Sequence, residues 1–215
     1  AYKNLSTVNT EFYYKIYSVV LLPTGSFALD FSEVESLFGD EALQGAERTA
    51  VIDGIKESAD GMWESYNYET EVKKMVALLN LMHTKLPEAK QPQVIKDILA
   101  KTKGASAEEK FVTWSKNAFA KSVFTSKAKL DAYLANPSEK KLTKDPLYNY
   151  YISLYTDAQT AGSVFRAANT EISKLQREYT AALMQKDPKK NFYPDANSTL
   201  RLTYGTVQDY EARDA

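Results

Sequence analysis

One apolar stripe runs through the last third of the sequence without a break. Its members are separated by alternating steps of four and three residues, which places them on one side of an α-helix. They are Leu147, Tyr151, Leu154, Ala158, Ala161, Phe165, Ala168, Ile172, Leu175, Tyr179 and Ala182. Asp145 suits the N-cap of this helix and Pro146 its first position, whereas Asp187-Pro188 suits its end.

The stripe predicts one helix from Pro146 to about Met184, roughly 55–60 Å long. A helix of that length predicts an elongated domain. We expect Phe165 and Ile172, in the middle of the stripe, to be buried. Gly162 lies beside the stripe and is the position at which we expect a bend or a close helix approach.

A segment of different character follows the long helix. Leu200, Leu202 and Tyr204 alternate with polar residues, which is the period of a β-strand. One strand cannot form a sheet, so its partners are expected outside this chain. The sequence therefore predicts a fragment of a larger protein, with a helical domain over 1–190 and a segment over 191–215 that returns toward another domain.

The rest of the chain is typical of an all-α protein. Apolar residues at helical spacing predict helices over about 4–22, 51–66, 72–86, 94–99, 106–119 and 126–134, with a short helix after Ser32. Pro23-Thr-Gly25 is expected to end the first of these helices. Ser106 and Glu109 form a capping-box pattern. The predicted fold is an elongated antiparallel helical bundle with one very long helix and an extended, strand-like C-terminal tail.

Composition limits the possible functions. The 215 residues carry a formal net charge of −1, which gives no electrostatic case for binding nucleic acid or an anionic membrane. There is no cysteine, so disulfides and a thiol nucleophile are excluded. No apolar run reaches membrane-spanning length, and no signal peptide opens the chain. Ala1-Tyr2-Lys3 does not resemble a natural start, so a leader could precede it.

No catalytic constellation is visible in the sequence. His83 is the only histidine, and its place in a helix next to Leu79 and Pro87 favours a packing or surface role. A catalytic triad needs a histidine presented to a nucleophile, and metal sites need clustered ligands. The carboxylate pairs Glu108-Glu109 and Glu69/Glu71 are expected on solvated helix surfaces. We therefore assign no catalytic residue, no metal ligand, no cofactor and no substrate-binding residue.

The fifteen tyrosines are the most unusual feature of the composition. One aromatic cluster comprises Phe12, Tyr13, Tyr14 and Tyr17, and the other comprises Tyr148, Tyr150, Tyr151 and Tyr155. Such clusters could line a cleft for a peptide or a sugar. The interpretation that we favour is that the rings fill the core of the bundle while the hydroxyls reach water.

The C-terminal segment closely resembles a signature of the bacterial dipeptidyl peptidases 7 and 11. The resemblance rests on Phe192, Tyr193, Pro194, Asp195, Asn197, Ser198, Arg201, Tyr204 and Gly205, within an unbroken run from Phe192 to Gly205. It extends upstream through Asn117–Thr125, Lys127–Ala135 and Lys144–Leu147, so that about 109–214 is covered well. Upstream of residue 109, the resemblance is limited to a generally helical sequence pattern.

This resemblance implies a specific function. The family comprises serine exopeptidases with a chymotrypsin-like double β-barrel and a helical domain that closes over the cleft. They release dipeptides from the free N-terminus of oligopeptides, use a His/Asp/Ser triad without a metal, and act in the periplasm or at the outer membrane of Gram-negative bacteria. The family's Gly-Asn-Ser-Gly-Ser-Pro nucleophile motif is absent from this chain, as is a match to the helical-domain asparagine that holds the substrate's amino group.

The resemblance therefore implies the helical cap of a periplasmic serine dipeptidyl peptidase, inactive by itself. Its expected partners are the peptide substrate of the parent enzyme and the parent's own β-barrel domain. Nucleic acid and a membrane span are not expected. A homodimer could form through the unpaired tail. The alternative is a free-standing helical module that binds a ligand or a protein through its tyrosine clusters.

Overall fold

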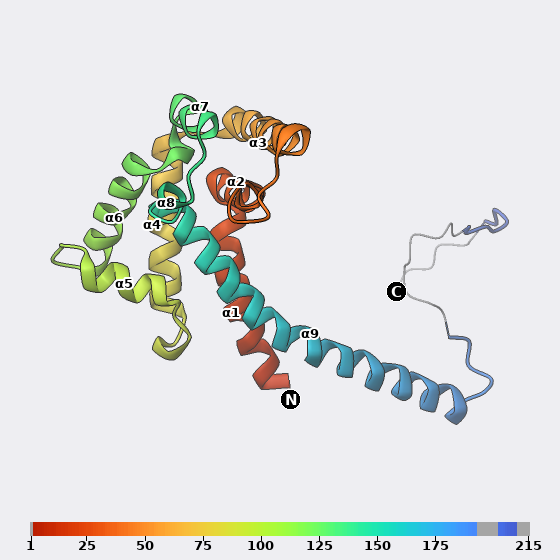
Figure 1. Ribbon diagram of the computed structural model, residues 1–215. Coiled ribbons are helices and arrows are strands. Elements are labelled where there is room, and N and C mark those ends of the chain that lie inside the picture. Colours follow the sequence, from red (N-terminus) through yellow and green to blue (C-terminus); the bar gives the residue numbers. More distant parts are fainter. Residues whose placement is uncertain (1, 193–201, 210–215) are drawn as a thin grey trace. The chain divides into compact units, whose positions relative to one another are not determined.

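The computed structural model describes residues 2–192 and 202–209 (Figure 1). Within this range, the side chains of residues 2–9 and of Phe165 are not described. The chain divides into two compact units, 1–170 and 171–215. The predicted domain boundary near residue 190 stays a prediction.

The described residues form helices throughout the first unit, as the all-α prediction requires. The α-helices are α1 Tyr2–Val20, α2 Pro23–Phe31, α3 Gly45–Ser65, α4 Tyr68–Lys85, α5 Gln93–Lys101, α6 Ala107–Lys121, α7 Lys127–Ala135, α8 Glu139–Leu142 and α9 Pro146–Lys186. Short 3₁₀ turns occupy Ser32–Leu37, Glu88–Lys90 and Val123–Thr125. Among the described helices, none combines the length and the apolarity needed to cross a lipid bilayer.

The junction of α1 and α2 differs from the prediction. Pro23-Thr-Gly25 ends α1, as expected, but it also begins α2, because proline is well suited to the first turn of a helix. Gly25 permits this tight connection. A Cβ atom built at Gly25 would lie 2.1 Å from the carbonyl oxygen of Val19, so no other residue fits here without moving the backbone.

An aromatic cluster holds the start of α9 against α2 and the turn at Val123–Thr125. Phe31 is fully buried and contacts the rings of Phe27, Phe124, Tyr133 and Tyr148, with centroids 4.9 to 6.1 Å apart. Burying large aromatic side chains supplies much of the hydrophobic stabilisation of a core. Because these residues come from four separate segments, the cluster fixes how the segments pack.

The long helix exists as predicted, beginning at Pro146 and ending at Lys186. Asp145 caps it: its Oδ1 accepts hydrogen bonds from the backbone N–H groups of Leu147 and Tyr148, both at 3.0 Å. Its Oδ2 accepts a further bond from the N–H of Val123 at 2.8 Å. The cap therefore also joins α9 to the turn that follows α6.

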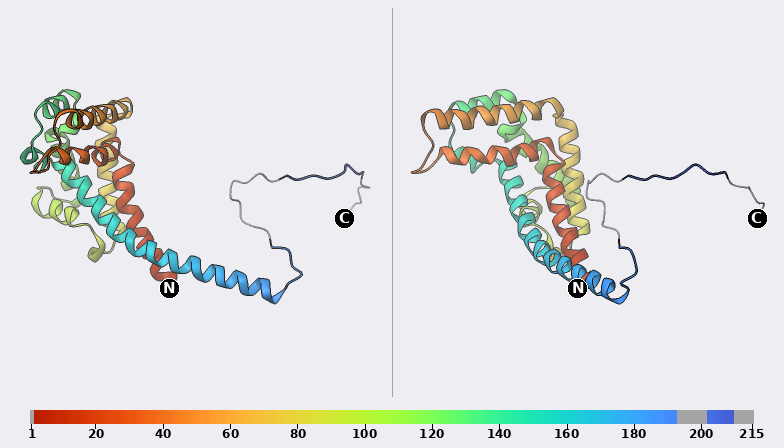
Figure 2. Two further views of the ribbon diagram at one scale, coloured as in Figure 1. Left: turned by 45° about the vertical axis from the view of Figure 1, so that its right-hand side comes forward. Right: turned by 90° about the vertical axis from the view of Figure 1, so that its right-hand side faces the viewer.

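The apolar stripe of α9 is buried only in its first half. Leu147, Tyr151, Leu154 and Ala158 are fully buried against the first unit. In this half α9 lies beside α1 (Figures 1 and 2), and a Cβ atom at Gly162 would lie 3.0 Å from the ring of Phe12. The close helix approach expected at Gly162 is confirmed.

The second half of the stripe does not meet the expectation of burial. Leu175 is 53% exposed and Tyr179 is 66% exposed, and Ile172 is half-buried. The predicted burial of Phe165 falls on a side chain outside the described residues. A continuous stripe predicts a helix face, but it does not say which protein surface covers that face.

Beyond α9, residues 202–209 show neither helix nor strand, and all are exposed. The predicted strand over Ser198–Val207 is therefore absent from its described part, Leu202–Val207. The physical reason is that a lone strand has no partner for its backbone N–H and C=O groups. Ser198–Arg201 lie outside the described residues.

Candidate functional site

His83 has a structural environment. Its Nδ1 lies 3.3 Å from Oε1 of Gln91, and its ring packs edge-on against Phe111. The amide of Gln91 also donates to the carbonyl oxygens of His83 and Leu86, at 2.8 and 3.2 Å. These bonds hold the connection between α4 and α5. No described serine or carboxylate is bonded to His83, and the described residues contain no group of three metal-ligating side chains.

The expectation that both Glu69 and Glu71 lie on a solvated helix surface is wrong for Glu71. Its side chain is buried, and its Oε2 accepts hydrogen bonds from the backbone N–H of Thr24 at 3.2 Å and from the Thr24 hydroxyl at 2.7 Å. The Thr24 hydroxyl also lies 2.8 Å from the hydroxyl of Tyr151. This network joins α2, α4 and α9 through one carboxylate at the N-terminus of α2.

Burial controls the titration of this network. Loss of solvation raises the pKa of Glu71, and the hydrogen bonds from Thr24 offset this only in part. Burial likewise raises the pKa of Tyr151 well above its usual value. Tyr66 is not hydrogen-bonded to the network but interacts with Glu71 through its charge, and burial raises the pKa of Tyr66 to about 12. The network is a structural one, because Thr24, Glu71 and Tyr151 are all fully buried.

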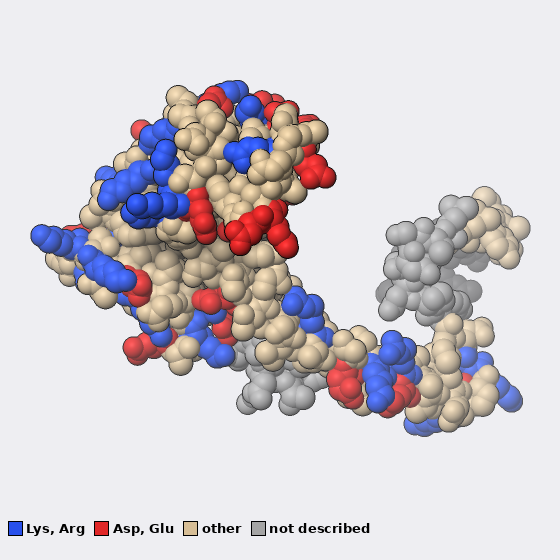
Figure 3. Space-filling model, in the orientation of Figure 1, with Lys and Arg blue, Asp and Glu red and all other residues tan. Residues whose placement is uncertain are grey.

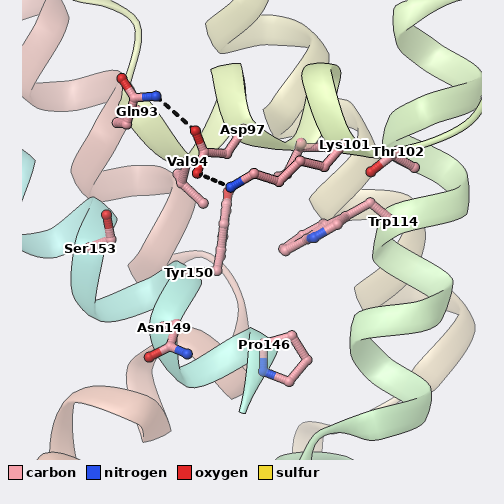
Figure 4. A pocket seen from close by; sticks show the side chains of 11 residues that line it. Gln93, Val94, Asp97, Lys101, Thr102, Trp114, Pro146, Asn149, Tyr150 and Ser153 are labelled. Carbon is pink, nitrogen blue, oxygen red and sulfur yellow. Dashed lines mark hydrogen bonds and ion pairs between the residues drawn. The ribbon is translucent and has the colours of Figure 1, made fainter. Parts of the chain in front are cut away.

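A groove lies where α5, α6 and the start of α9 meet. Two hollows of about 380 and 400 Å³ share Lys101, Thr102, Trp114 and Pro146 and form one depression. On α5 and α6 the lining residues recur at helical spacing. This is seen in Gln93, Asp97 and Lys101 on α5, and in Trp114, Asn117 and Lys121 on α6. Each helix thus turns one side toward the groove, as Figure 4 shows for the first hollow.

The walls of the groove combine apolar, aromatic and charged groups. The Trp114 and Tyr150 rings contact each other with centroids 5.2 Å apart. In Figure 4 the Tyr150 side chain extends from α9 toward α5, where Asp97 is bound to Lys101 and Gln93 at 2.7 Å each. The hydrogen bonds from Lys101 and Gln93 lower the pKa of the Asp97 carboxyl.

Tyr150 is the least satisfied polar residue of the groove. Its side chain is 1% exposed, and its hydroxyl has no hydrogen-bond partner among the described residues. Burial raises the pKa of this hydroxyl above its usual value, so it is a neutral O–H donor at any ordinary pH. The interpretation that tyrosine rings fill the core is confirmed for Tyr148, Tyr150 and Tyr151, but the last two hydroxyls do not reach water.

The other aromatic cluster is divided between core and surface: Tyr14 packs against the core, whereas Tyr13 and Tyr17 are exposed. Tyr13 and Tyr17, on α1, are 40% and 47% exposed and stack with their centroids 5.3 Å apart. The two hollows of the groove, and a third hollow lined by Val20, Leu21 and Pro23, do not bring this cluster together with Tyr150 or Tyr151. None of these three hollows is therefore a cleft lined by both clusters.

Most of the signature residues cannot be placed. Phe192 is half-buried, with Nζ of Lys190 5.4 Å from its ring centroid, and Tyr204 is 94% exposed. Gly205 is described and has open space around it. Tyr193, Pro194, Asp195, Asn197, Ser198 and Arg201 lie outside the described residues. The groove was not predicted from the sequence, although Trp114, Asn117 and Lys121 share one helical face.

Comparison with known proteins gives a consistent family assignment. The model of the family described as peptidase S46 matches residues 8–215. The Asp/Glu-specific dipeptidyl-peptidase of Porphyromonas gingivalis is 34% identical over 179 residues, which are 81% of this chain and 24% of that protein. Dipeptidyl-peptidase 7 of the same organism is 27% identical over 165 residues, 75% of this chain and 23% of that protein.

A solved structure shares the fold. The crystal structure of Porphyromonas endodontalis DPP11 in complex with the dipeptide Arg-Glu matches with a TM-score of 0.67 and 24% sequence identity. The match covers 90% of this chain and 27% of that one. This chain thus spans about a quarter of the length of the relatives that it matches. Because the family model matches nearly the whole sequence, the chain belongs to the peptidase S46 family.

Proposed function

We propose that this chain is the helical cap of a serine dipeptidyl peptidase that releases dipeptides from the free N-terminus of oligopeptides. The relatives are dipeptidyl peptidases, and this chain corresponds to about a quarter of their length. Its single histidine is engaged with Gln91 rather than with a nucleophile. On this proposal the triad and the β-barrel belong to the rest of the parent protein, which acts in the periplasm or at the outer membrane.

The main observation in support of the cap role is that the second half of the α9 stripe is exposed. The stripe residues Leu175 and Tyr179 are 53% and 66% exposed, on a helix whose stripe is buried in its first half. Exposed apolar side chains on one helix face are typical of a surface that another part of a protein covers. We assign that cover to the remainder of the parent enzyme. A cap that closes on the cleft would exclude water and admit short peptides.

The isolated chain is expected to be inactive. Hydrolysis by a serine peptidase requires a nucleophile and a base that act together, so dipeptidyl chromogenic substrates should be hydrolysed by the full-length parent and not by this chain. Hydrolysis that co-purifies with the chain and disappears in a His83→Ala variant would contradict the cap proposal. A full-length parent without dipeptidyl peptidase activity would contradict the proposed reaction.

The tail supports a related proposal about assembly. Leu202, Tyr204 and Val207 are 82%, 94% and 103% exposed, so in the parent their segment is proposed to pair with strands of the β-barrel. In the isolated chain the same segment is proposed to pair with a second copy. Sedimentation analysis should then show a dimer that is lost when 192–215 are deleted. A monomer before and after the deletion would count against pairing.

A further inference from the structure

The groove between α5, α6 and α9 carries a positive rim. Lys101, Lys103 and Lys121 surround it, and Asp97 is its one carboxylate among the lining residues. Asp97 is already bound to Lys101, whereas Lys103 and Lys121 form no ion pair with any described residue. The rim thus offers two uncompensated ammonium groups to a ligand.

This charge is part of a wider pattern along the chain. Residues 101–144 contain ten lysines and four carboxylates, although the whole chain has a net charge of −1. Figure 3 shows blue side chains gathered on the side of the molecule where Figure 1 places α5 and α6. A local excess of one sign raises the concentration of oppositely charged ligands near the groove.

The inner wall of the groove is suited to an apolar group. Trp114 and Val94 are half-buried, Ile98 is 3% exposed, and Pro146 lies between the two hollows. Each hollow has the volume typical of a small-ligand site. An indole face and aliphatic side chains favour an aromatic or aliphatic side chain over a bare inorganic anion.

One buried hydrogen-bond donor of the groove lacks an acceptor in the described part of the chain. The hydroxyl of Tyr150 is buried without a hydrogen-bond partner among the described residues. Buried donors are almost always paired in folded proteins. A ligand with a carbonyl or carboxylate oxygen would supply the missing acceptor, and a peptide carries such oxygens next to its side chains.

We infer that this groove binds a short peptide through a carboxylate held by Lys103 and Lys121, with an apolar side chain against Trp114. The peptide part of this inference rests on the proposed function, in which peptides are substrates and dipeptides are products. The carboxylate part rests on the groove alone. The carboxylate could be the C-terminus of the peptide or an acidic side chain, and the two sources are separable by experiment.

Direct binding to the intact 215-residue chain tests the inference without any peptidase assay. A Trp63→Phe background leaves Trp114 as the only tryptophan, so its fluorescence reports on the groove. The probes are N-acetyl-Ala-Phe with a free carboxylate, its C-terminal amide, and N-acetyl-Ala-Glu amide. Binding should saturate at about millimolar concentrations, as expected for small ligands with few contacts.

The three probes distinguish a C-terminal carboxylate from a side-chain carboxylate. Binding of the free acid and loss of binding by its amide assign the carboxylate to the C-terminus of the peptide. Binding of the Glu amide assigns it to an acidic side chain, which retains the carboxylate chemistry. Equal binding of all three probes, or no change in Trp114 fluorescence with any of them, would overturn the inference. Neither result bears on whether the parent enzyme hydrolyses peptides.

Variants locate the site. Lys103→Ala and Lys121→Ala should each weaken binding by roughly two- to fivefold, the range expected for exposed ion pairs. Lys116→Ala is the matched control, because Lys116 is exposed on α6 but does not line the groove. An equal effect of all three substitutions would indicate general charge attraction and would refute a site in the groove.

Tyr150→Phe separates ligand binding from folding. The Tyr150 hydroxyl has no hydrogen-bond partner in the described structure. The thermal unfolding midpoint of the variant should therefore equal or exceed that of the wild-type chain. Affinity for the bound probe should nevertheless fall several-fold, because the ligand loses a donor. An unchanged affinity would exclude the hydroxyl from the site. Isothermal titration calorimetry provides a measurement independent of fluorescence.

Discussion

At the scale of single residues, buried polar groups determine how this chain responds to pH. Glu71 joins three helices while it is sealed from solvent. Glu11 behaves in the opposite way. Burial acts to raise its pKa, but hydrogen bonds and charges from Lys15 and Lys90 outweigh burial and lower it. The pKa values of these two glutamates thus shift in opposite directions. Glu11 is ion-paired with Lys15 and Lys90 at 2.8 and 3.1 Å, whereas the charge of Lys74 does not offset the burial of Glu71.

We expect Glu71→Gln to stabilise the chain relative to wild type as the pH rises. Because the pKa of Glu71 is raised in the folded state, its favourable contribution is complete below the ordinary value of 4.5 and is lost as the pH rises through the folded pKa. The amide oxygen of glutamine can still accept both bonds from Thr24. Urea unfolding at several pH values measures the difference, and a difference that is constant above pH 4.5 would exclude a raised pKa.

Glu71→Ala provides the contrasting substitution. It leaves the buried N–H and hydroxyl of Thr24 without their acceptor, so it should lower the free energy of unfolding by about 1–3 kcal/mol at neutral pH. Glu69→Ala is the matched control, because Glu69 is exposed on the same turn of α4. Equal effects at the two positions would mean that Glu71 is not the buried member of the pair.

At the scale of the elements, α9 is one continuous helix with two different environments. Its first half supplies core residues, and its cap at Asp145 is tied to the turn after α6. Its second half exposes the same kind of side chain. The helix persists because its backbone hydrogen bonds are internal and do not depend on a covering surface.

Leucine substitutions along α9 measure this difference. Leu154→Ala removes a fully buried side chain and should lower the free energy of unfolding by about 2–5 kcal/mol. Leu175→Ala, at 53% exposure, should change it by roughly half a kcal/mol or less in the isolated chain. Thermal or urea unfolding of both variants provides the measurement. Comparable losses would place the second half of the stripe in a core.

Two glycines offer a second test at this scale. Gly25→Ala should be strongly destabilising, because the new Cβ atom would meet the backbone of Val19. Gly54 lies inside α3 with open space around it, so Gly54→Ala should instead stabilise the chain by up to ~1 kcal/mol through helix propensity. The signs of the two changes in unfolding midpoint should be opposite. A Gly25→Ala variant that unfolds at the wild-type temperature or above it would refute the tight α1–α2 connection.

At the scale of the whole protein, the uncovered α9 face is the main link between this chain and its proposed parent. If the remainder of the enzyme covers this face, amides around 172–184 should exchange hydrogen more slowly in the full-length protein than in the isolated chain. Amides around 147–158 should be protected in both, because that half is packed within this chain. Equal exchange around 172–184 in the two proteins would contradict the proposed contact.

Some of this protein follows from its sequence alone. The step pattern from Leu147 to Ala182, with Asp145-Pro146 before it, was sufficient to predict α9 to within two residues at its end, because helix periodicity and capping are local properties. The capping box at Ser106 and Glu109 was predictable for the same reason, and the N–H of Glu109 does donate to the Ser106 hydroxyl. The family signature from Phe192 to Gly205 is likewise a property of the sequence.

Other features were decided only by tertiary packing. Glu71 shares a helix face with Met75 and Leu79, but its burial depends on α2 bringing the Thr24 donors to it. The groove brings Asp97, Trp114 and Tyr150 together from three helices, and no local pattern encodes which helix faces meet. Periodicity specifies that α9 has an apolar face. What covers that face depends on surfaces distant in sequence, which is why burial stops near Ala161 while the stripe continues to Ala182.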